Sequence, residues 1–346
     1  MNKILVVATS RKTRGGITSV IKAHETGEQW KHFRCHWVQT HRDGAAWHKI
    51  LYFATGMIDF LIKLPFYDIV HIHTADYGTE KRKRIFAKLA KLFGKKLIVH
   101  LHSSGPEYSI GGEYRDLYKY SFTHADKVVL LSHTWREEAK TTFHLPPERM
   151  EVLYNPCPAV NPSQPKEREP YILFAGTLTH RKGYDDLIKA FARIAQRYPD
   201  WRLKLAGNGE IENGKRLAKE YGIENQIDFL GWINGNDKDR AFRHASIYCL
   251  PSYSEGFPMG VLDAWAYHLP VVTTPVGGIP DVGVDGENLL LFMPGDIPVL
   301  AQKIEMLISD QALYNRICAA SANFAENTFN INVIANQLVV LYNSLL

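Results

Sequence analysis

Apolar residues along the chain gather into short runs that are hydrophobic at nearly every position, and longer stretches with helical spacing separate these runs. Such runs are typical of parallel strands that helices bury on both faces of a sheet. In the first half they predict strands at Lys3–Ala8, Arg34–Thr40, Asp68–His73, Lys96–His102, Lys127–Leu131 and Glu151–Tyr154. The stretches between them predict helices at Thr18–Gln29, Ala46–Leu64, Lys81–Phe93, Glu113–His124 and Thr134–Phe143.

Prolines crowd the polar stretch from Asn155 to Pro170, which predicts a linker between two domains. Beyond it, strands are predicted at Tyr171–Ala175, Arg202–Ala206, Gln226–Leu230, Ser246–Leu250, Val271–Thr273 and Asn288–Phe292. Helices are predicted at Tyr184–Arg197, Asn213–Tyr221, Lys238–His244 and around Gly260–Tyr267, before a mostly helical tail from Ile297. Two such arrays predict an α/β protein of two doubly wound, Rossmann-like domains. Ligands are expected beyond the carboxyl ends of the strands, in a cleft between the domains.

Composition places the chain among ordinary globular proteins, with 45% hydrophobic and 22% charged residues. Its four cysteines lie far apart and form no CxxC pair, which favours free thiols in the reducing cytoplasm. The apolar run at Ile4–Ala8 is too short for a signal peptide and is interpreted as the first strand. The longest apolar stretch, Ile50 to Phe66, contains Asp59 and Lys63 and is too short to predict a transmembrane helix.

Charge is distributed unevenly between the two halves. Residues 1–160 hold 24 Lys and Arg against 15 Asp and Glu, a net charge of +9, whereas residues 161–346 hold 17 against 21, a net charge of −4. A basic half suggests an anionic partner, either nucleic acid or a membrane surface. Aromatic residues do not alternate with the Lys and Arg residues as in single-strand binders, so no nucleic-acid partner is expected.

The basic stretch from Lys81 to Lys96 predicts a surface helix at an anionic membrane. It holds eight Lys and Arg residues, beginning with Lys81-Arg82-Lys83-Arg84. Its apolar residues are expected to pack on the first sheet through one helical face: Ile85, Phe86, Leu89, Leu92 and Phe93. Packing does not require so much positive charge, so a peripheral contact with the inner face of the plasma membrane is expected.

Two features of the first half are candidates for ligand contact. Gly15 and Gly16 stand at the mouth of the first helix, where backbone N–H groups can approach an anion, although glycine pairs are also common in turns. His102 ends a strand and is expected at the sheet edge where ligands bind, although such a residue also serves purely structural roles. The loop has no Walker lysine and no GxGxxG pattern.

Histidines also form two spaced pairs, His71 with His73 and His100 with His102. Because the two residues of each pair alternate along a strand, their rings are interpreted as pointing to opposite faces of the sheet. No metal site is therefore expected there.

In the second half, Arg181 and Lys182 are predicted to open the helix after the strand Tyr171–Ala175. Cations at a helix N-terminus oppose the macrodipole, and a diphosphate ligand would resolve this conflict. The alternative is a solvated surface pair.

Glu255 precedes a turn rich in Gly and Pro, and Asp263 lies eight positions further on in the following helix. Carboxylates that accept from hydroxyls and amides that donate to phosphate suit a sugar nucleotide, although Glu255 alone could be a capping residue.

These segments resemble the retaining glycosyltransferases of family 4, which adopt the GT-B fold. The similarity lies in Gly15-Gly16, in His102, in Arg181-Lys182 and in Glu255 with Asp263. The flanking phrases GTLTHRKGYDDLIKAF and PSYSEGFPMGVLDAWAYHLPVVTTPVGG are also typical of that family. The resemblance extends over essentially the whole chain. It implies an acceptor-side domain at residues 1–160, a nucleotide-sugar domain at residues 161–328, and a last helix at about residues 329–346 that packs back on the first domain.

The resemblance also implies roles for individual residues. Arg181 and Lys182 would bind the donor diphosphate, Glu255 would contact the transferred sugar, and His102 would lie beside it, so these four are the catalytic candidates. The substrate-binding candidates are Gly15, Gly16, Asn208, Gly231, Trp232, Ile233, Gly256, Phe257, Met259, Gly260, Val261 and Asp263. Asp263 would contact the ribose and departs from the family pattern, in which glutamate is usual.

Asp237-Lys238-Asp239 matches the DxD motif of metal-dependent transferases, but it is interpreted as the acidic start of a helix. No metal and no cofactor are expected.

The function implied is retaining transfer of a sugar from a UDP- or GDP-sugar to a glycan or polyprenyl-linked acceptor, in bacterial surface polysaccharide synthesis such as that of lipopolysaccharide or capsule. Two alternatives stay open from the residues alone. One is a non-hydrolysing nucleotide-sugar epimerase of the same fold, for which no further acid or base carboxylates are identified. The other is a non-catalytic nucleotide-sugar-binding module.

Overall fold

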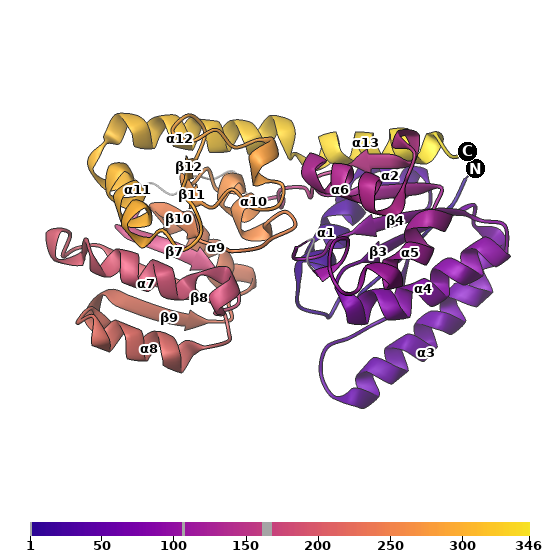
Figure 1. Ribbon diagram of the computed structural model, residues 1–346, viewed down its shortest axis with the longest axis horizontal. Helices are drawn as coiled ribbons and strands as arrows, with labels where there is room; N and C mark the ends of the chain where they lie inside the picture. Colours follow the sequence, from indigo (N-terminus) through magenta and orange to yellow (C-terminus); the bar gives the residue numbers. More distant parts are fainter. Residues whose placement is uncertain (1, 106–107, 161–167) are drawn as a thin grey trace. The chain divides into compact units, whose positions relative to one another are not determined.

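The computed structural model describes residues 2–105, 108–160 and 168–346. The chain folds into two compact units, and Phe329–Leu346 returns to the first of them after the second is complete (Figure 1). The first unit comprises Met1–Pro156 and Phe329–Leu346, and the second comprises Cys157–Thr328. The division falls at Pro156 rather than at residue 160. Pro162 and Pro165 of the expected linker lie outside the described residues.

The first unit is built on a six-stranded parallel sheet in the order β2-β1-β3-β4-β5-β6. Its strands are β1 (Ile4–Ala8), β2 (His36–Gln39), β3 (Ile69–Thr74), β4 (Lys96–Leu101), β5 (Lys127–Leu130) and β6 (Met150–Val152). Its helices are α1 (Gly16–Thr26), α2 (Glu28–His32), α3 (Ala46–Lys63), α4 (Tyr77–Leu92), α5 (Arg115–His124), α6 (His133–Phe143) and α13 (Ile331–Asn343).

Alternating side chains of the first-unit sheet enter two separate cores, as the continuous apolar runs require. Leu5 and Val7 of β1 join the core that contains Phe60 of α3 and Phe86 of α4. Ile4, Val6 and Ala8 of β1 join the other core, together with Ile21 of α1 and residues of α13: Ile334, Leu338, Leu341 and Tyr342. The last helix therefore covers one face of the first sheet.

The second unit has a six-stranded parallel sheet in the order β12-β11-β10-β7-β8-β9. Its strands are β7 (Tyr171–Ala175), β8 (Arg202–Ala206), β9 (Ile227–Gly231), β10 (Ile247–Leu250), β11 (Val271–Thr273) and β12 (Leu290–Leu291). Its helices are α7 (Tyr184–Ala192), α8 (Ile211–Glu220), α9 (Gly235–His244), α10 (Met259–Ala266), α11 (Ile297–Ser309) and α12 (Gln311–Asn323). Each strand lies within two residues of its predicted bounds, which confirms two doubly wound α/β units.

The basic helix differs from its prediction in two respects. It begins at Tyr77 after the N-cap Asp76, and of its predicted packing face only Phe86 is buried and Leu89 partly buried. Ile85, Leu92 and Phe93 are 43%, 78% and 50% exposed. Lys83, expected at the surface, is instead buried, and its Nζ donates to Thr40 Oγ1 at 2.7 Å. The lysine stem and its ammonium are thus enclosed between α4 and the end of β2.

Among the described residues, no helix combines the length and the apolar composition that crossing a bilayer requires.

Candidate active site

Strand order places the candidate residues of the second unit at one edge of its sheet. The chain runs from β7 outward through β8 to β9, and then returns to the other side of β7 with β10. The carboxyl ends of β7 and β10 therefore flank the point where the strand order reverses, which is where open α/β sheets bind ligands. The loop from Gly176 to Gly183 follows β7, and the loop from Pro251 to Pro258 follows β10.

Arg181 and Lys182 lie before α7 and do not open it, which corrects the sequence prediction. They belong to a separate 3₁₀ turn, His180–Lys182, and Gly183 then leads into the helix with φ +70°. A Cβ at Gly183 would lie 2.0 Å from the carbonyl oxygen of Pro251, so a larger residue would separate the two loops. The first turn of α7 contains Asp185 and Asp186, which complement its macrodipole.

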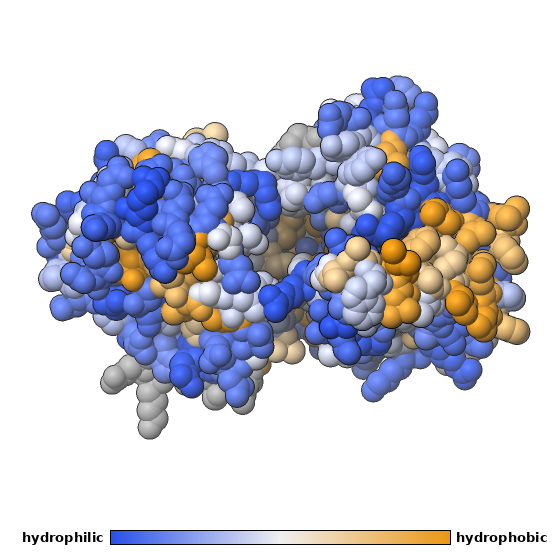
Figure 2. Space-filling model, turned by 90° about the horizontal axis from the view of Figure 1, so that it is seen from below, coloured by the Kyte–Doolittle hydropathy of each residue, from blue (hydrophilic) through white to orange (hydrophobic). Residues whose placement is uncertain are grey.

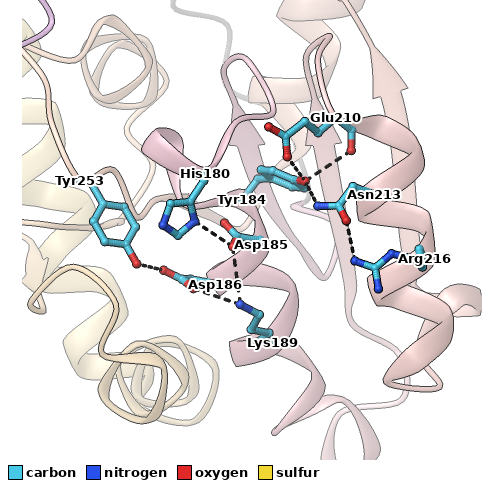
Figure 3. Close-up of polar contacts among 9 residues, drawn as sticks. All are labelled: His180, Tyr184, Asp185, Asp186, Lys189, Glu210, Asn213, Arg216 and Tyr253. Atoms are coloured by element: carbon cyan, nitrogen blue, oxygen red, sulfur yellow. Dashed lines mark hydrogen bonds and ion pairs between the residues drawn. The ribbon is translucent and has the colours of Figure 1, made fainter.

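A polar network lies on both sides of the first turn of α7 (Figure 3). His180 Nδ1 lies 3.0 Å from Asp185 Oδ2, and Tyr253 Oη donates to Asp186 Oδ2 at 2.7 Å. On the other side of α7, Tyr184 Oη donates to Glu210 Oε2 at 2.9 Å and accepts from Asn213 Nδ2 at 2.6 Å. The loops after β7, β8 and β10 therefore all contact α7, and α8 contacts it through Asn213.

The loops after β7 and β10 also contact each other through the predicted catalytic residues. Arg181 Nη1 donates to the carbonyl oxygen of Ser254 at 2.7 Å, and the Tyr253 N–H donates to the carbonyl oxygen of Arg181 at 2.8 Å. Lys182 Nζ forms an ion pair with Glu255 Oε1, and Ser252 Oγ donates to the same oxygen at 2.7 Å. Glu255 is only 6% exposed. The structure therefore brings three predicted residues, Arg181, Lys182 and Glu255, into one cluster of charges.

Asp263 is buried in α10 and has a partner that the sequence did not reveal. Lys238 Nζ lies 2.7 Å from Asp263 Oδ1, and it approaches from α9. Burial raises the pKa of Asp263, and the Lys238 ammonium opposes this shift. Lys238 is the central residue of the DxD sequence, in which Asp239 accepts from Arg243 and from Tyr267. Only contacts between α9 and α10 could identify this lysine.

The other candidates of the second unit divide into loop backbone and core side chains. Gly231 ends β9 with φ +63°, and Trp232 beyond it is 44% exposed. The carbonyl oxygen of Asn208, after β8, accepts from the Leu178 N–H at 2.8 Å. Ile233 follows Trp232 in the same loop, while Gly256 and Met259 lie between β10 and the first turn of α10. By contrast, the side chains of Phe257 and Val261 are buried, and a Cβ at Gly260 would lie 2.0 Å from Tyr248 Oη.

In the first unit, the glycine pair and His102 occur in different surroundings. Gly15 is the N-cap of α1 with φ +144°, and a Cβ there would meet nothing within 4 Å, so the turn is open. His102 follows β4 and is half-buried. Its Nε2 lies 2.8 Å from His73 Nδ1, and burial lowers the pKa of His102 to about 3, so the ring is neutral.

The histidine pairs contradict the prediction that their rings point to opposite faces. The ring centroids are 4.3 Å apart for His71 and His73 and 4.1 Å apart for His100 and His102. Residues two apart on a strand lie on the same face, because the pleat repeats every second residue. The argument against a metal site therefore fails.

Comparisons with known families and structures agree with this arrangement. Residues 18–159 match the family described as Glycosyltransferase Family 4, and residues 159–324 match Glycosyl transferases group 1. HepE of Anabaena, solved with UDP-glucose, has a TM-score of 0.78 at 20% identity over 99% of both chains. Sucrose-phosphate synthase of Thermosynechococcus elongatus has a TM-score of 0.77 at 18% identity, over 100% of this chain and 99% of that chain. These likenesses confirm the two-domain GT-B fold.

Relatives with curated descriptions have a higher sequence identity to this chain than these solved structures do, but they match a shorter part of it. A glycosyltransferase of Haemophilus influenzae, described as uncharacterised, is 33% identical over 225 residues, which are 62% of this chain and 60% of that protein. The capsular polysaccharide biosynthesis glycosyltransferase CapM of Staphylococcus aureus is 28% identical over 50% of this chain and 46% of its own length. The chain thus matches less than two thirds of the length of either relative.

The pairing of Lys238 with Asp263 yields a test of this site. Replacing Lys238 with Ala should lower the free energy of unfolding at pH 7 by about 1–2 kcal/mol, because a buried carboxylate then lacks its counter-charge. When folding raises the pKa of a carboxyl, the folded protein loses stability as pH rises through that pKa, because the folded state must then hold an unfavourable charge. The loss in Lys238→Ala should therefore shrink toward pH 4 in urea-unfolding measurements.

Two further variants control this measurement. Adding Asp263→Asn to Lys238→Ala should recover most of the loss at pH 7. Lys215→Ala, which breaks an exposed pair with Glu212, should change stability by less than about 0.5 kcal/mol. A loss of the same size at pH 4 and pH 7 would contradict the pairing.

Proposed function

Since the chain belongs to the group 1 glycosyltransferases, we propose that it transfers a sugar from a nucleotide diphosphate sugar to a glycan or lipid-linked acceptor, with retention of anomeric configuration. The family match favours transfer over the alternatives of an epimerase and a non-catalytic binding module. HepE was solved with UDP-glucose, which supports a nucleotide-sugar donor. CapM acts in capsular polysaccharide biosynthesis, which supports a role in assembling a bacterial surface glycan.

One observation supports the proposal above all: the cluster of Arg181, Lys182 and Glu255 at the reversal point of the second sheet. Two cations that backbone and carboxylate contacts hold beside the carboxyl ends of β7 and β10 suit a diphosphate, because their charge complements its own. In the proposed reaction Arg181 and Lys182 neutralise the charge that develops on the leaving diphosphate. Glu255 shares Lys182 until the donor binds, and then contacts the transferred sugar.

The remaining residues receive roles that follow from their positions. Asp263, paired with Lys238, is proposed to accept from the ribose hydroxyls, and the loop of Gly231, Trp232 and Ile233 to contact the base. In the first unit we assign Gly15 and Gly16 to phosphate contact and His102, as a neutral hydrogen-bonding ring, to the sugar.

Lys182→Ala should reduce turnover at least about 100-fold, because it removes a charged contact to the leaving group. Transfer would be followed as release of nucleoside diphosphate over a panel of UDP- and GDP-sugars. Circular dichroism would establish that the variant is folded. Lys215→Ala, on the exposed face of α8, is the matched control and should keep wild-type turnover. A Lys182→Ala enzyme as fast as wild type would remove this residue from the mechanism.

The reaction is proposed to need no divalent ion at the diphosphate, because Arg181 and Lys182 already supply its counter-charge. Turnover should therefore stay within about twofold when EDTA is present or when Mn²⁺ is added. If EDTA abolished turnover and Mn²⁺ restored it, Asp237 and Asp239 would become candidate ligands.

A surface of the first unit supports contact with an anionic membrane. α3 and the turn after it expose large apolar side chains: Trp47, Ile50, Leu51, Ile58, Leu61, Ile62 and Phe66. Lys95, just beyond α4, donates to the carbonyl oxygen of Pro65 at 3.1 Å, which places the exposed Leu92 and Phe93 near the end of α3. Figure 2 shows hydrophobic residues gathered on this side of the first unit. We call this area the α3/α4 surface.

Charge on α4 indicates which partner fits the α3/α4 surface. Lys81 and Lys88 are exposed on the helix, and Lys96 is exposed beyond its end, whereas Lys83 is buried and cannot contact lipid. Apolar side chains beside lysines match a bilayer with anionic headgroups, where each cation contributes about 1 kcal/mol. We propose that the α3/α4 surface holds the enzyme at the membrane that carries a lipid-linked acceptor.

Sedimentation with vesicles tests this surface. The protein should bind vesicles containing anionic lipid, and 0.5 M salt should weaken the binding. Lys81→Glu with Lys88→Glu should reduce binding to anionic vesicles about 10-fold or more, and Ile50→Asp with Ile62→Asp should abolish it. Lys215→Glu with Lys219→Glu, on exposed positions of α8, is the matched control. Equal binding of all variants to neutral and anionic vesicles would exclude the proposal.

A further inference from the structure

A group of buried histidine nitrogens in the first unit lacks hydrogen-bond partners. They are Nε2 of His24, Nε2 of His71, Nε2 of His73, and both ring nitrogens of His100. Each of these side chains is at most 3% exposed. Buried polar atoms are nearly always paired, so several orphaned nitrogens in one place require an explanation such as an unseen ligand.

Strand register brings three of these rings together. β3 and β4 are parallel neighbours in which His73 stands opposite His100, and His71 lies one pleat repeat earlier on β3. Ring centroids are 4.3 Å apart for His71 and His73, 4.9 Å for His73 and His100, and 5.5 Å for His71 and His100. One nitrogen of each ring lies within 4.8 Å of the other two.

The second nitrogen of two of these rings is held from outside the group. His71 Nδ1 lies 2.9 Å from the hydroxyl of Tyr342 on α13, and His73 Nδ1 lies 2.8 Å from His102 Nε2. In metal sites a histidine ligand commonly uses its far nitrogen in such a contact, which fixes the tautomer and the orientation of the ring. The nitrogens that face the group, Nε2 of His71 and Nε2 of His73, then remain free to bind a metal ion.

We propose that His71, His73 and His100 bind one divalent transition-metal ion such as Zn²⁺, with His24 or a water molecule as the fourth ligand. Imidazole nitrogens suit Zn²⁺, Cu²⁺ and Ni²⁺, whereas a set without oxygen donors excludes Mg²⁺ and Ca²⁺. Tetrahedral Zn²⁺ with bonds of about 2.0–2.1 Å places ligand nitrogens roughly 3.4 Å apart. The three nitrogens now lie within 4.8 Å of one another, so small inward rotations of the rings would bring them to this spacing.

His24 has the right position for the fourth ligand. It belongs to α1, which covers this face of the sheet, and its ring centroid lies 6.1 Å from that of His73. Among the described residues, His71, His73 and His100 form the one set of His, Cys, Asp or Glu side chains with a spacing suited to a metal ion. The ion would join β3, β4 and α1. Through His73 it would also orient His102.

Co²⁺ is the probe for this site, because tetrahedral Co²⁺ absorbs strongly in the visible range. Full-length protein would be stripped with chelator under mild denaturation, refolded, and titrated with Co²⁺ and then Zn²⁺. We expect one Co²⁺ per chain, its displacement by Zn²⁺, and a higher melting temperature with Zn²⁺. X-ray absorption on the Zn²⁺ form should show four nitrogen or oxygen neighbours at about 2.0 Å.

Two variants locate the site. His71→Phe and His100→Phe should each weaken Zn²⁺ binding at least about 100-fold, whereas His124→Gln, at an exposed position on α5, should bind as wild type does. If either Phe variant fails to fold, the absorption spectra of the wild-type protein still decide the matter. Folded wild-type protein that takes up no Co²⁺, or a Co²⁺ spectrum retained in both Phe variants, would overturn the proposal.

Discussion

The ion pair between Lys182 and Glu255 makes one site out of two loops that are 73 residues apart in sequence. Neither loop is held in place by its own strand alone. The 3₁₀ turn with Arg181 and Lys182 is set by α7 behind it, and the loop of Ser252 and Glu255 is set by backbone contacts to that turn. Because the pair is largely buried, the attraction between its two charges is strong. A diphosphate that binds Lys182 has to compete with Glu255 for it.

Strand positions could be predicted from the sequence because a buried parallel strand is apolar on both faces and leaves an unbroken run. The arrangement of side chains beyond the strand ends is a different matter, since it depends on which strands become neighbours. Arg181 and Glu255 share one edge only because β10 pairs with β7 and not with β9. The resemblance to a known family supplied this juxtaposition, and no local pattern did.

Two errors and one omission of the sequence interpretation have distinct physical causes. The histidine pairs were assigned to opposite faces, although a spacing of two returns a side chain to the same face. Lys83 was placed at the surface because its neighbours are cationic, whereas its ammonium reaches Thr40 inside the unit. The acidic helix start at Asp237 was predicted correctly, but the pairing of Lys238 with Asp263 was missed because it depends on packing between α9 and α10. The contacts of Lys83 and Lys238 lie outside any short sequence window, whereas the histidine error concerns residues only two positions apart.

The return of the chain to its first unit has a consequence for how the protein is made. α13 closes the core over β1 and β3, and Tyr342 meets His71 across 271 residues of sequence. During synthesis the first unit therefore leaves the ribosome with one face of its sheet covered only in part, by α1, while the whole second unit is translated. That second unit is an insertion whose internal contacts can form earlier. The second unit should consequently complete its fold before the first unit, although synthesis of the first unit begins earlier. A premature stop before α13 would leave apolar side chains of β1 and β3 exposed to aggregation.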